Sequence, residues 1–291
     1  MPYVTLTIYS PEDLSEILKA ELAFAGFESF LELENGAFET SIDVNFFDQQ
    51  SLENILNRYP RSLIRLETRL EEKQNWNQLW EAYYPDVIVD HRCRVRAEFH
   101  LPALNSLGKP FEYELIITPK MSFGTGHHET TLQMLQLILD LDCKGKKVAD
   151  FGCGTGILAI LALKKGASCA DGWDIEAWSV ENAAENAHLN GVKLNAYLGT
   201  VAQCQQPRGY YDLIFANIHL SVLLEEVPLY AQLLAQDGRL LLSGFYLSEV
   251  EAIAQVCQEN GLVVERQREK NNWAALQCVK RLGNYPQKTI I

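Results

Sequence analysis

The first quarter of the chain mixes strand-like and helix-like patterns of apolar residues. Residues 3–9 alternate apolar and polar positions, whereas residues 11–24 carry apolar side chains at helical spacing. The expected elements are, in order, a strand at 3–9, a helix at 11–24, strands at 27–33 and 37–44, a helix at 50–59 and a strand at 63–70. The two middle strands flank Asn35-Gly36, a pair typical of hairpin turns. This β-α-β-β-α-β order predicts a small α+β ferredoxin-like domain over residues 1–72.

From about residue 146 the pattern becomes a regular alternation of apolar strands and helices. Strands are expected at 147–151, 169–175, 195–198, 212–218 and 239–245, and helices at 157–165, 176–189, 221–235 and 248–260. Such alternation indicates parallel βαβ units. The chain continues into strands at 262–268 and 273–279, and their turn at 270–272 is too short for a parallel crossover. We therefore expect a seven-stranded, Rossmann-like α/β core with an antiparallel last pair.

The segment between these two parts predicts a linker followed by the start of the second domain. Residues 73–86 are expected to form a linker helix whose aromatic side chains serve packing. Short strands are expected at 87–89, 94–99 and 112–117. The predicted organisation is a substrate-recognition domain at 1–72, a linker helix at 73–86 and a catalytic domain at 87–291.

The charge of the chain is concentrated in the first of these domains. The 291 residues include 25 Lys and Arg and 38 Asp and Glu, a formal net charge of −13. Residues 1–72 hold fourteen of the acids but only five bases, so this quarter contributes −9. An acidic surface repels phosphate, which argues against direct nucleic-acid binding, and it attracts basic partners. Charge alone equally fits a simple role in solubility.

The composition favours a soluble cytoplasmic protein. The chain is 47% hydrophobic and 22% charged, as is usual for globular proteins. Its best apolar run, Ile157 to Leu163, falls far short of the roughly 20 residues of a membrane span. The first ten residues lack the basic and apolar sections of a signal peptide. The seven cysteines contain no C-x-x-C pair, so neither a disulfide framework nor a zinc site is expected. As to oligomeric state, we expect a monomer.

The clearest candidate for a ligand site is Asp150-Phe-Gly-Cys-Gly-Thr-Gly156, which follows an apolar strand and precedes an apolar helix. Glycines let a ligand approach the backbone closely, and the first turn of a helix offers unpaired N–H groups. Asp174, eighteen residues after Gly156 and at the end of the next strand, is placed to hold ribose hydroxyls. A tight turn with an unrelated exposed acid would not explain this combination.

The spacing of the glycines discriminates between nucleotide cofactors. The dinucleotide fingerprint is G-x-G-x-x-G, whereas Gly152, Gly154 and Gly156 form G-x-G-x-G with Asp150 two residues before the first. This pattern resembles that of class I S-adenosylmethionine-dependent methyltransferases, and so does the antiparallel last strand pair. S-adenosylmethionine has no pyrophosphate, but its amino-acid end carries an ammonium group. The negative charge of Asp150 near that group would be electrostatically favourable.

A second glycine-rich segment, Phe123-Gly-Thr-Gly-His-His-Glu-Thr-Thr131, precedes an amphipathic helix. Thr131 or Thr130 is expected to cap that helix, and the loop is expected to fold over a bound cofactor. The adjacent His127 and His128 raise the question of a metal ion. Neighbouring residues rarely ligate one ion together, and no acid or cysteine pattern completes a zinc site, so no metal is expected.

Asn217 ends the strand at 212–218, and the carboxyl ends of strands are where this architecture binds ligands. Its side chain could accept hydrogen bonds from an amine. The alternative, an Asn that only caps the following helix, is common. The position at the strand end favours the functional interpretation.

These motifs, in this order and together with Gly172-Trp-Asp-Ile-Glu176 and Ala216-Asn-Ile218, are similar over the whole chain to those of the PrmA family. Members of that family are bacterial methyltransferases of large-subunit ribosomal protein L-eleven. The Phe-Gly-Thr-Gly-x-His-x-Thr-Thr segment is far more restricted than the glycine motif. The chain departs from the family's commonest forms at Thr118-Pro-Lys-Met121, Trp173 and Glu176.

The resemblance implies contacts to S-adenosylmethionine at Thr131, Gly152, Asp174 and Asn217. It also implies methylation of amines, namely lysine ε-amino groups and an N-terminal α-amino group of ribosomal protein L-eleven. In that reaction Asn217 would orient the amine and Phe123 would line the methyl-transfer site. His127 and His128 are candidates for removing the amine proton. The acidic domain at 1–72 then becomes a candidate docking domain for the basic substrate.

Other functions remain open at this stage. No Asn-Pro-Pro-Tyr follows the fourth core strand, and enzymes that methylate DNA bases or glutamine amides resemble one another through that motif. A class I methyltransferase acting on another protein or a small molecule is the main alternative. A non-catalytic cofactor-binding module is a further one, although the intact motifs argue against it.

Overall fold

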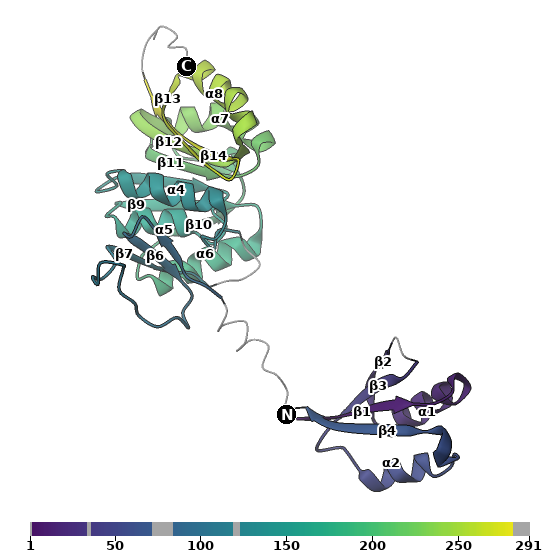
Figure 1. Cartoon of the computed structure of the whole chain (residues 1–291). Helices are drawn as coiled ribbons and strands as arrows, with labels where there is room; N and C mark the ends of the chain where they lie inside the picture. Colours follow the sequence, from purple (N-terminus) through teal and green to yellow (C-terminus); the bar gives the residue numbers. More distant parts are fainter. Residues whose placement is uncertain (1, 34–35, 72–83, 119–122, 282–291) are drawn as a thin grey trace. The chain divides into compact units, whose positions relative to one another are not determined.

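The structure, a computed structural model, describes residues 2–33, 36–71, 84–118 and 123–281 (Figure 1). The chain divides into two compact units, Met1–Tyr84 and Pro85–Ile291. Nearly all of the linker helix predicted at 73–86 lies outside the described residues. Each unit has a hydrophobic core of its own.

The first unit is built on a four-stranded antiparallel sheet with two helices. Its elements are β1 (Tyr3–Tyr9), α1 (Glu12–Phe24), β2 (Glu28–Glu32), β3 (Phe38–Asp43), α2 (Gln49–Leu56) and β4 (Arg65–Glu71). The strand order β2-β3-β1-β4 confirms the ferredoxin-like topology. Its core consists mainly of apolar side chains from the two central strands and from both helices, including Leu6, Ile8, Leu18, Leu22, Phe38, Ile42, Leu52 and Leu56.

The second unit opens with a small three-stranded sheet and a helix. Strands β5 (Val87–Val89), β6 (Cys93–Arg96) and β7 (Tyr113–Ile116) precede α4 (Glu129–Asp140). β6 ends three residues earlier than the sequence predicts, because the Ala97 N–H donates to Nδ1 of His100 at 3.1 Å instead of to a strand. β6 pairs antiparallel with β5 and parallel with β7.

The core sheet has seven strands, as predicted. In chain order the elements are β8 (Lys147–Phe151), α5 (Ile157–Lys164), β9 (Cys169–Asp174), α6 (Ala177–Leu189), β10 (Asn195–Leu198), β11 (Tyr211–Asn217), α7 (Leu220–Leu233), β12 (Leu234–Tyr246), α8 (Val250–Glu259), β13 (Leu262–Lys270) and β14 (Trp273–Lys280). β12 begins five residues earlier than expected, because Leu234 already pairs with Tyr211 before the register shifts. The antiparallel β13–β14 pair is confirmed.

The strand order β10-β9-β8-β11-β12-β14-β13 decides where a ligand can bind. The five strands from β10 to β12 are parallel, and β14 inserts antiparallel between β12 and β13. The order of connection reverses between β8 and β11. In open α/β sheets, ligands bind beyond the carboxyl ends of the strands at such a reversal.

Two hydrophobic layers cover the core sheet, because its strands are apolar on both faces. Side chains of α4, α5 and α6 pack with one face, for example with Val148 and Phe215. Side chains of α7 and α8 pack with the other face, for example with Ala149 and Ala216. Neighbouring residues of β8 and of β11 thus face opposite layers, which confirms the predicted α/β arrangement of helices on both sides of a mostly parallel sheet. No helix within the described ranges is long and apolar enough to cross a membrane.

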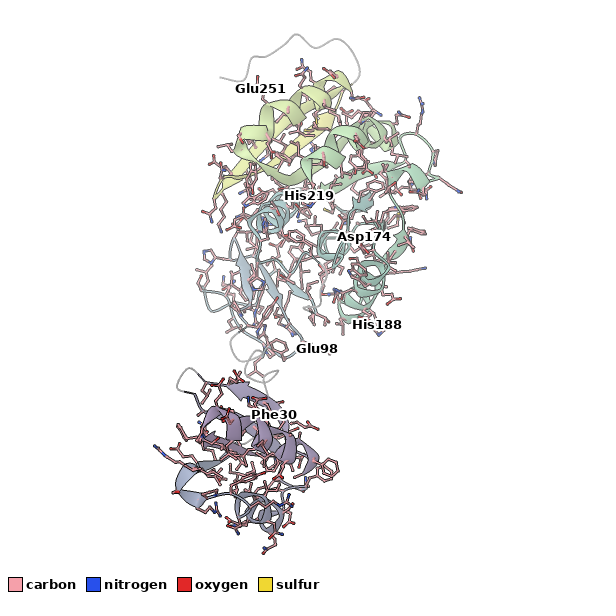
Figure 2. The ribbon with its side chains drawn as sticks, turned by 90° about the vertical axis from the view of Figure 1, so that its right-hand side faces the viewer. Phe30, Glu98, Asp174, His188, His219 and Glu251 are labelled. Carbon is pink, nitrogen blue, oxygen red and sulfur yellow. The ribbon has the colours of Figure 1, made fainter. Side chains whose placement is uncertain are left out.

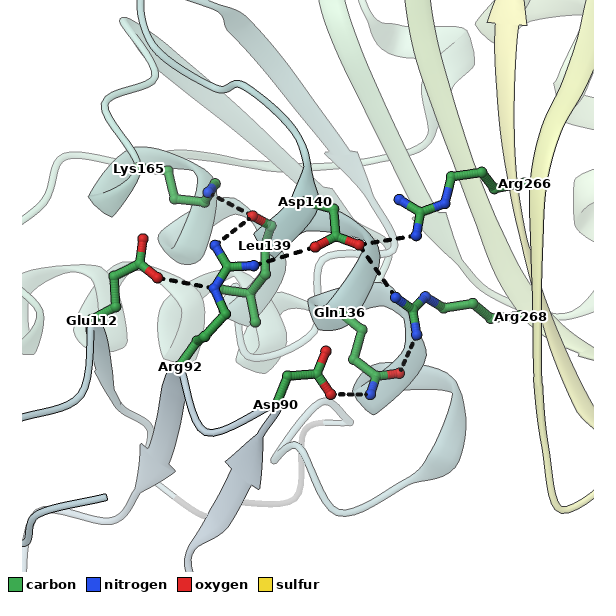
Figure 3. A network of polar contacts seen from close by, with 9 residues as sticks. All are labelled: Asp90, Arg92, Glu112, Gln136, Leu139, Asp140, Lys165, Arg266 and Arg268. Carbon is green, nitrogen blue, oxygen red and sulfur yellow. Dashed lines mark hydrogen bonds and ion pairs between the residues drawn. The ribbon is translucent and has the colours of Figure 1, made fainter. Parts of the chain in front are cut away.

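A polar network anchors the end of α4 to the small sheet and to the hairpin (Figure 3). The carboxylate of Asp140 accepts hydrogen bonds from Arg266 at 3.0 Å, Arg268 at 3.3 Å and Arg92 at 3.2 Å. Gln136, one turn earlier, accepts from Arg268 and donates to Asp90 at 2.7 Å. A single carboxylate therefore binds Arg92, in the turn just before β6, and both Arg266 and Arg268 of β13.

Candidate active site

A cavity of about 510 Å³ lies at the reversal point of the core sheet. This volume falls in the range of roughly 300–1,000 Å³ that is usual for small-molecule sites. Figure 2 labels two residues of its lining, Asp174 at the end of β9 and His219 just after β11. Loops after the core strands supply most of the lining, including Phe151, Gly152, Gly154, Asp174–Glu176, Gly199–Val201 and Asn217–His219.

The glycine turn after β8 forms one wall of the cavity. Two positions of this turn leave no room for a side chain, so the wall there is bare backbone. Gly152 and Gly154 have φ values of +70° and +52°, which L-residues rarely adopt. A Cβ atom at Gly152 would lie 2.2 Å from Ile218 Cγ2, and one at Gly154 would lie 2.3 Å from the Phe123 carbonyl oxygen. Both predicted cofactor residues therefore line the cavity with backbone alone.

Gly156 has a different place from the one that the sequence predicts. It does not line the cavity but faces α6, where a Cβ atom would lie 3.1 Å from the side chains of Ala183 and Leu194. With φ at +77°, it permits the close packing of the turn against the helix. Its contribution to a cofactor site is therefore indirect.

Asp174 is held in the cavity wall by backbone groups. Its Oδ2 accepts a hydrogen bond from the Gly154 N–H at 2.9 Å, and its Oδ1 accepts one from the Glu176 N–H at 3.0 Å. A carboxylate offers about four acceptor sites, so both oxygens keep capacity for hydroxyl groups of a ligand. This fixed orientation suits the ribose-binding role predicted for Asp174.

Asp150 lies behind the turn rather than in the cavity. Its side chain is fully buried, and its Oδ2 accepts a hydrogen bond from the Ala159 N–H of α5 at 3.2 Å. The pKa of Asp150 is raised to about 7, mainly by burial, with a smaller contribution from the charge of Asp174 and an opposing one from the Ala159 N–H. Because Asp150 is absent from the lining, its position does not support the expected contact with a cofactor ammonium group.

Asn217 presents an unsatisfied acceptor at the end of β11. Its Oδ1 is buried and has no hydrogen-bond partner among the described residues, while its Nδ2 donates to Thr131 Oγ1 at 3.4 Å. Asn217 lines the cavity, whereas Thr131 is fully buried behind it. The side chain of Asn217 therefore carries a buried, unpaired carbonyl oxygen at the edge of the cavity, and an N–H donor would satisfy it.

Three aromatic side chains, Phe123, His128 and Trp273, form what we call the aromatic wall of the cavity. The His128 ring contacts Phe123 edge-on at 5.3 Å and Trp273 at 4.8 Å between ring centroids. Tyr246 supports the wall from outside the lining, with its ring 4.2 Å from that of Trp273. Phe123 was predicted here from its motif, but Trp273 was not, because only the insertion of β14 brings it to the cavity.

The two adjacent histidines have separate roles. His127 is exposed and lies outside the cavity lining, and its Nε2 donates to the Pro85 carbonyl at 3.0 Å. His128 is the N-cap of α4, since its Nδ1 accepts from the Thr130 N–H at 3.3 Å. The expectation that Thr130 or Thr131 caps this helix was therefore wrong. The expectation that His127 takes a proton from the substrate has no support from its position.

Two further residues of the lining were not predicted from the sequence. His219 follows Asn217 by two positions, and its place after a core strand could have identified it. Glu226 lies on α7 and accepts a hydrogen bond from the Tyr230 hydroxyl, and no local sequence signal marks it. Across the described parts of the chain, no group of three or more His, Cys, Asp or Glu side chains could hold a metal ion.

Comparison with known proteins places this site in a family. A family model described as ribosomal protein L11 methyltransferase (PrmA) matches residues 21–281. The chain belongs to the PrmA family. A PrmA-family protein of Porphyromonas gingivalis, named ribosomal protein L11 methyltransferase, is 38% identical over 280 residues, which cover 92% of this chain and 93% of that protein. A relative of the same name from Phocaeicola vulgatus is 35% identical over 274 residues, 93% of this chain and 95% of that protein.

A solved structure supports the same assignment. The ribosomal protein L11 methylase of Lactobacillus delbrueckii subsp. bulgaricus superimposes with a TM-score of 0.59 at 28% sequence identity. The match covers 68% of this chain and 100% of that chain. The predicted class I methyltransferase fold is thereby confirmed.

Proposed function

We propose that this PrmA-family protein transfers methyl groups from S-adenosylmethionine to amino groups of ribosomal protein L11 in the cytoplasm. The acceptors would be lysine ε-amino groups and the N-terminal α-amino group. Family membership supports the substrate, since the relatives are named for it. The observation that carries the chemistry is the unpaired Oδ1 of Asn217 at the cavity, beside the aromatic wall.

The residues of the cavity fit S-adenosylmethionine. Asp174 keeps free acceptor sites for ribose hydroxyls, and the bare backbone at Gly152 and Gly154 allows a ligand to lie close against it. When bound, S-adenosylmethionine supplies an electrophilic methyl group on its sulfonium. Thr131 holds Asn217 from behind through the 3.4 Å contact with Nδ2.

The amine must be neutral before it can attack, and the cavity favours that form. The ordinary pKa of a lysine amine is about 10.4, and burial lowers it because an apolar environment disfavours the charged form. Phe123 and Trp273 supply such an environment on one side. Asn217 Oδ1 would accept one N–H of the neutral amine and so direct its lone pair toward the methyl group. Holding reactants in this way can contribute up to about 7–11 kcal/mol to catalysis.

The test is methyl transfer from labelled S-adenosylmethionine to a mixture of purified ribosomal proteins. We expect the label in ribosomal protein L11, at lysine and N-terminal amines identified by mass spectrometry. Label in ribosomal RNA, in another protein or only in small molecules would contradict the proposed substrate.

Substitution of Asn217 separates catalysis from cofactor binding in the same assay. The variant Asn217→Ala should lower turnover roughly 10- to 100-fold at saturating cofactor, because the amine is no longer oriented. Calorimetry should show that cofactor binding weakens much less than turnover. Unchanged turnover at saturation would reject a catalytic role for Asn217.

The acidic first unit is the proposed docking unit for the substrate. Residues 1–72 carry a net charge of −9, which would attract a basic protein and speed its encounter. We propose further that one copy of the chain is sufficient for activity, since the second unit alone supplies every residue assigned to the cavity.

A further inference from the structure

We propose that Thr155 and Asn186 are positioning residues, which together hold the Phe123 segment against the cofactor-binding turn. Neither residue lines the cavity, and both are fully buried. The inference rests on the proposed function, because it concerns the wall that would receive the substrate amine. Its basis is a chain of three hydrogen bonds that runs from α6 through the turn to Phe123 and Gly124.

Thr155 joins the turn to the Phe123 segment at two successive carbonyls. Its backbone N–H donates to the Phe123 carbonyl at 3.0 Å, and its Oγ1 donates to the Gly124 carbonyl at 2.6 Å. The two backbone segments approach each other so closely that a Cβ atom at Gly124 would lie 2.8 Å from Thr155 Oγ1. Glycine at positions 124 and 154 is therefore what allows this contact to form.

Asn186 extends the connection to α6. Its Nδ2 donates to the Thr155 carbonyl at 3.0 Å and to Asn182 Oδ1 at 3.2 Å, and its Oδ1 accepts from the Thr118 N–H at 2.9 Å. One carboxamide thus fixes both the cofactor-binding turn and the chain just after β7. A buried group with all these partners is strongly oriented, since each lost bond would leave an unsatisfied polar atom.

Asn190, one helical turn later, fixes the end of β7 in the same manner. Its Oδ1 accepts from the Ile116 N–H at 2.9 Å, and its Nδ2 donates to the Ile116 carbonyl at 2.6 Å. Asn190, the C-cap of α6, therefore bonds both backbone groups of Ile116, as a neighbouring strand would. Asn186 fixes the backbone at Thr118, and Thr155 fixes it at Phe123.

A purely architectural role would predict bonds that end on core elements, whereas the two bonds donated by Thr155 do not. They end on Phe123, which is 53% exposed and lines the cavity, and on Gly124 beside it. Because Phe123 is more than half exposed, its position depends strongly on the bonds that hold its backbone. A displacement of about 1 Å in a positioning group can cost 100-fold in rate.

The experiment compares Thr155→Val, which removes the hydroxyl but keeps the shape, with Thr155→Ser, which keeps the hydroxyl. We measure kcat/KM for ribosomal protein L11, the Kd for S-adenosylmethionine, and the hydrogen-exchange rate of the amide of residue 155 in the protein without ligand. We expect Thr155→Val to lower kcat/KM roughly tenfold or more, with a change in cofactor Kd of only about twofold. The exchange rate should rise, and Thr155→Ser should stay close to the wild type.

Ser168→Ala is the matched control, because Ser168 Oγ also donates to a backbone carbonyl, that of Lys146, at 3.0 Å. This bond lies at the amino ends of β8 and β9, opposite to the cavity, so kcat/KM should not change. Asn186→Ala should raise the exchange rate of the Thr118 amide and lower kcat/KM. If it does not fold, the Thr155 variants still decide the matter.

Three results would overturn the proposal. These are unchanged kcat/KM and exchange in Thr155→Val, an equal loss of cofactor affinity and kcat/KM, or a Thr155→Ser variant as impaired as Thr155→Val. The exchange measurement needs no substrate. It therefore tests the connection even if the wild type proves not to methylate ribosomal protein L11, which would refute the proposed function alone.

Discussion

At the scale of single residues, the cavity combines charged and polar groups whose partners decide what they can do. Asp174 is tied to two backbone N–H groups yet faces the cavity, whereas Asp150 is sealed behind the turn. Asn217 keeps one acceptor unpaired. Each of these differences gives a measurable expectation.

Replacement of Asp174 should weaken cofactor binding. In Asp174→Ala the ribose hydroxyls would lose a charged acceptor, and hydrogen bonds to charged groups contribute about 1.5–3 kcal/mol each, so Kd should rise roughly 10- to 100-fold. Titration calorimetry with S-adenosylmethionine measures this change. Circular dichroism should show an intact fold, and an unaltered Kd in a folded variant would remove Asp174 from the site.

Asp150 should make stability depend on pH. Its folded pKa of about 7 is raised above the ordinary value of 3.8, mainly by burial. Its contribution to stability is therefore fully present below pH 3.8 and is lost as the pH rises through about 7. The variant Asp150→Asn cannot ionise and should lack this dependence.

The measurement for Asp150 is thermal unfolding of both proteins between pH 5 and 8. The Tm of the wild type relative to Asp150→Asn should fall across this range, because only the wild type must bury a charge at the higher pH. A difference in Tm that is independent of pH would show that Asp150 is ionised throughout.

At the scale of elements, the sequence predicts the order and type of most helices and strands, because strands buried on both faces alternate with helices of clear periodicity. It places the boundary between α7 and β12 too late, since the pairing of Leu234 with Tyr211 depends on a strand distant in sequence. The sequence could not show which of His127 and His128 lines the cavity. That choice depends on where α4 begins, which His128 itself determines by capping the helix.

The sequence also could not assign the side to which Asp150 points. β8 is apolar on both faces, so no polar alternation marks a direction, and the acid before the glycines was interpreted as a ligand contact. Trp273 was predicted to start a strand, but its place at the cavity depends on the insertion of that strand beside β12. Gly152, Gly154, Asp174, Asn217 and Phe123 were predicted from local motifs and do line the cavity.

The link through Asp140 between α4, the turn before β6 and β13 should contribute to stability. Burial alone would raise the pKa of Asp140, but the hydrogen bond from Arg266 and the charges of Arg268 and Arg92 outweigh it and lower the pKa. The ionised carboxylate therefore stabilises the fold above its unfolded pKa of about 3.9, and this contribution is lost as the pH falls through the lower folded value.

The variant Asp140→Asn leaves these arginines without their shared counter-charge. Because the carboxylate is one-third exposed, we expect a modest loss of about 1–2 kcal/mol in the free energy of unfolding at pH 7. Urea denaturation at pH 7 and pH 3 measures it. The loss should shrink at pH 3, and a loss of equal size at both values would contradict an electrostatic origin.

At the scale of the whole molecule, the charge of the chain is divided unequally between its two units. Residues 1–72 carry −9 of the total −13, and the cavity residues all belong to the other unit. If the first unit docks a basic substrate, protein binding and cofactor binding should respond differently to ionic strength.

We expect the KM for ribosomal protein L11 to rise as salt increases from 0.01 M to 0.5 M, while the Kd for S-adenosylmethionine changes little. Attraction between exposed charges is screened beyond a Debye length, which shortens from about 30 Å at 0.01 M to about 10 Å at 0.1 M. Steady-state kinetics and calorimetry over this range measure the two constants. Equal salt dependence of both would place the charge effect at the cavity instead of the docking unit.

The insertion of β14 between β12 and β13 also fixes the order in which the parts of the site form during synthesis. A ribosome makes the glycine turn, Asp174 and Asn217 before Trp273, which begins the final strand of the sheet. The growing chain therefore carries the proposed cofactor-binding groups first and gains the aromatic wall only once β14 has paired. An enzyme whose proposed substrate is a ribosomal protein would in this way complete its amine-binding side only after its cofactor-binding groups have been made.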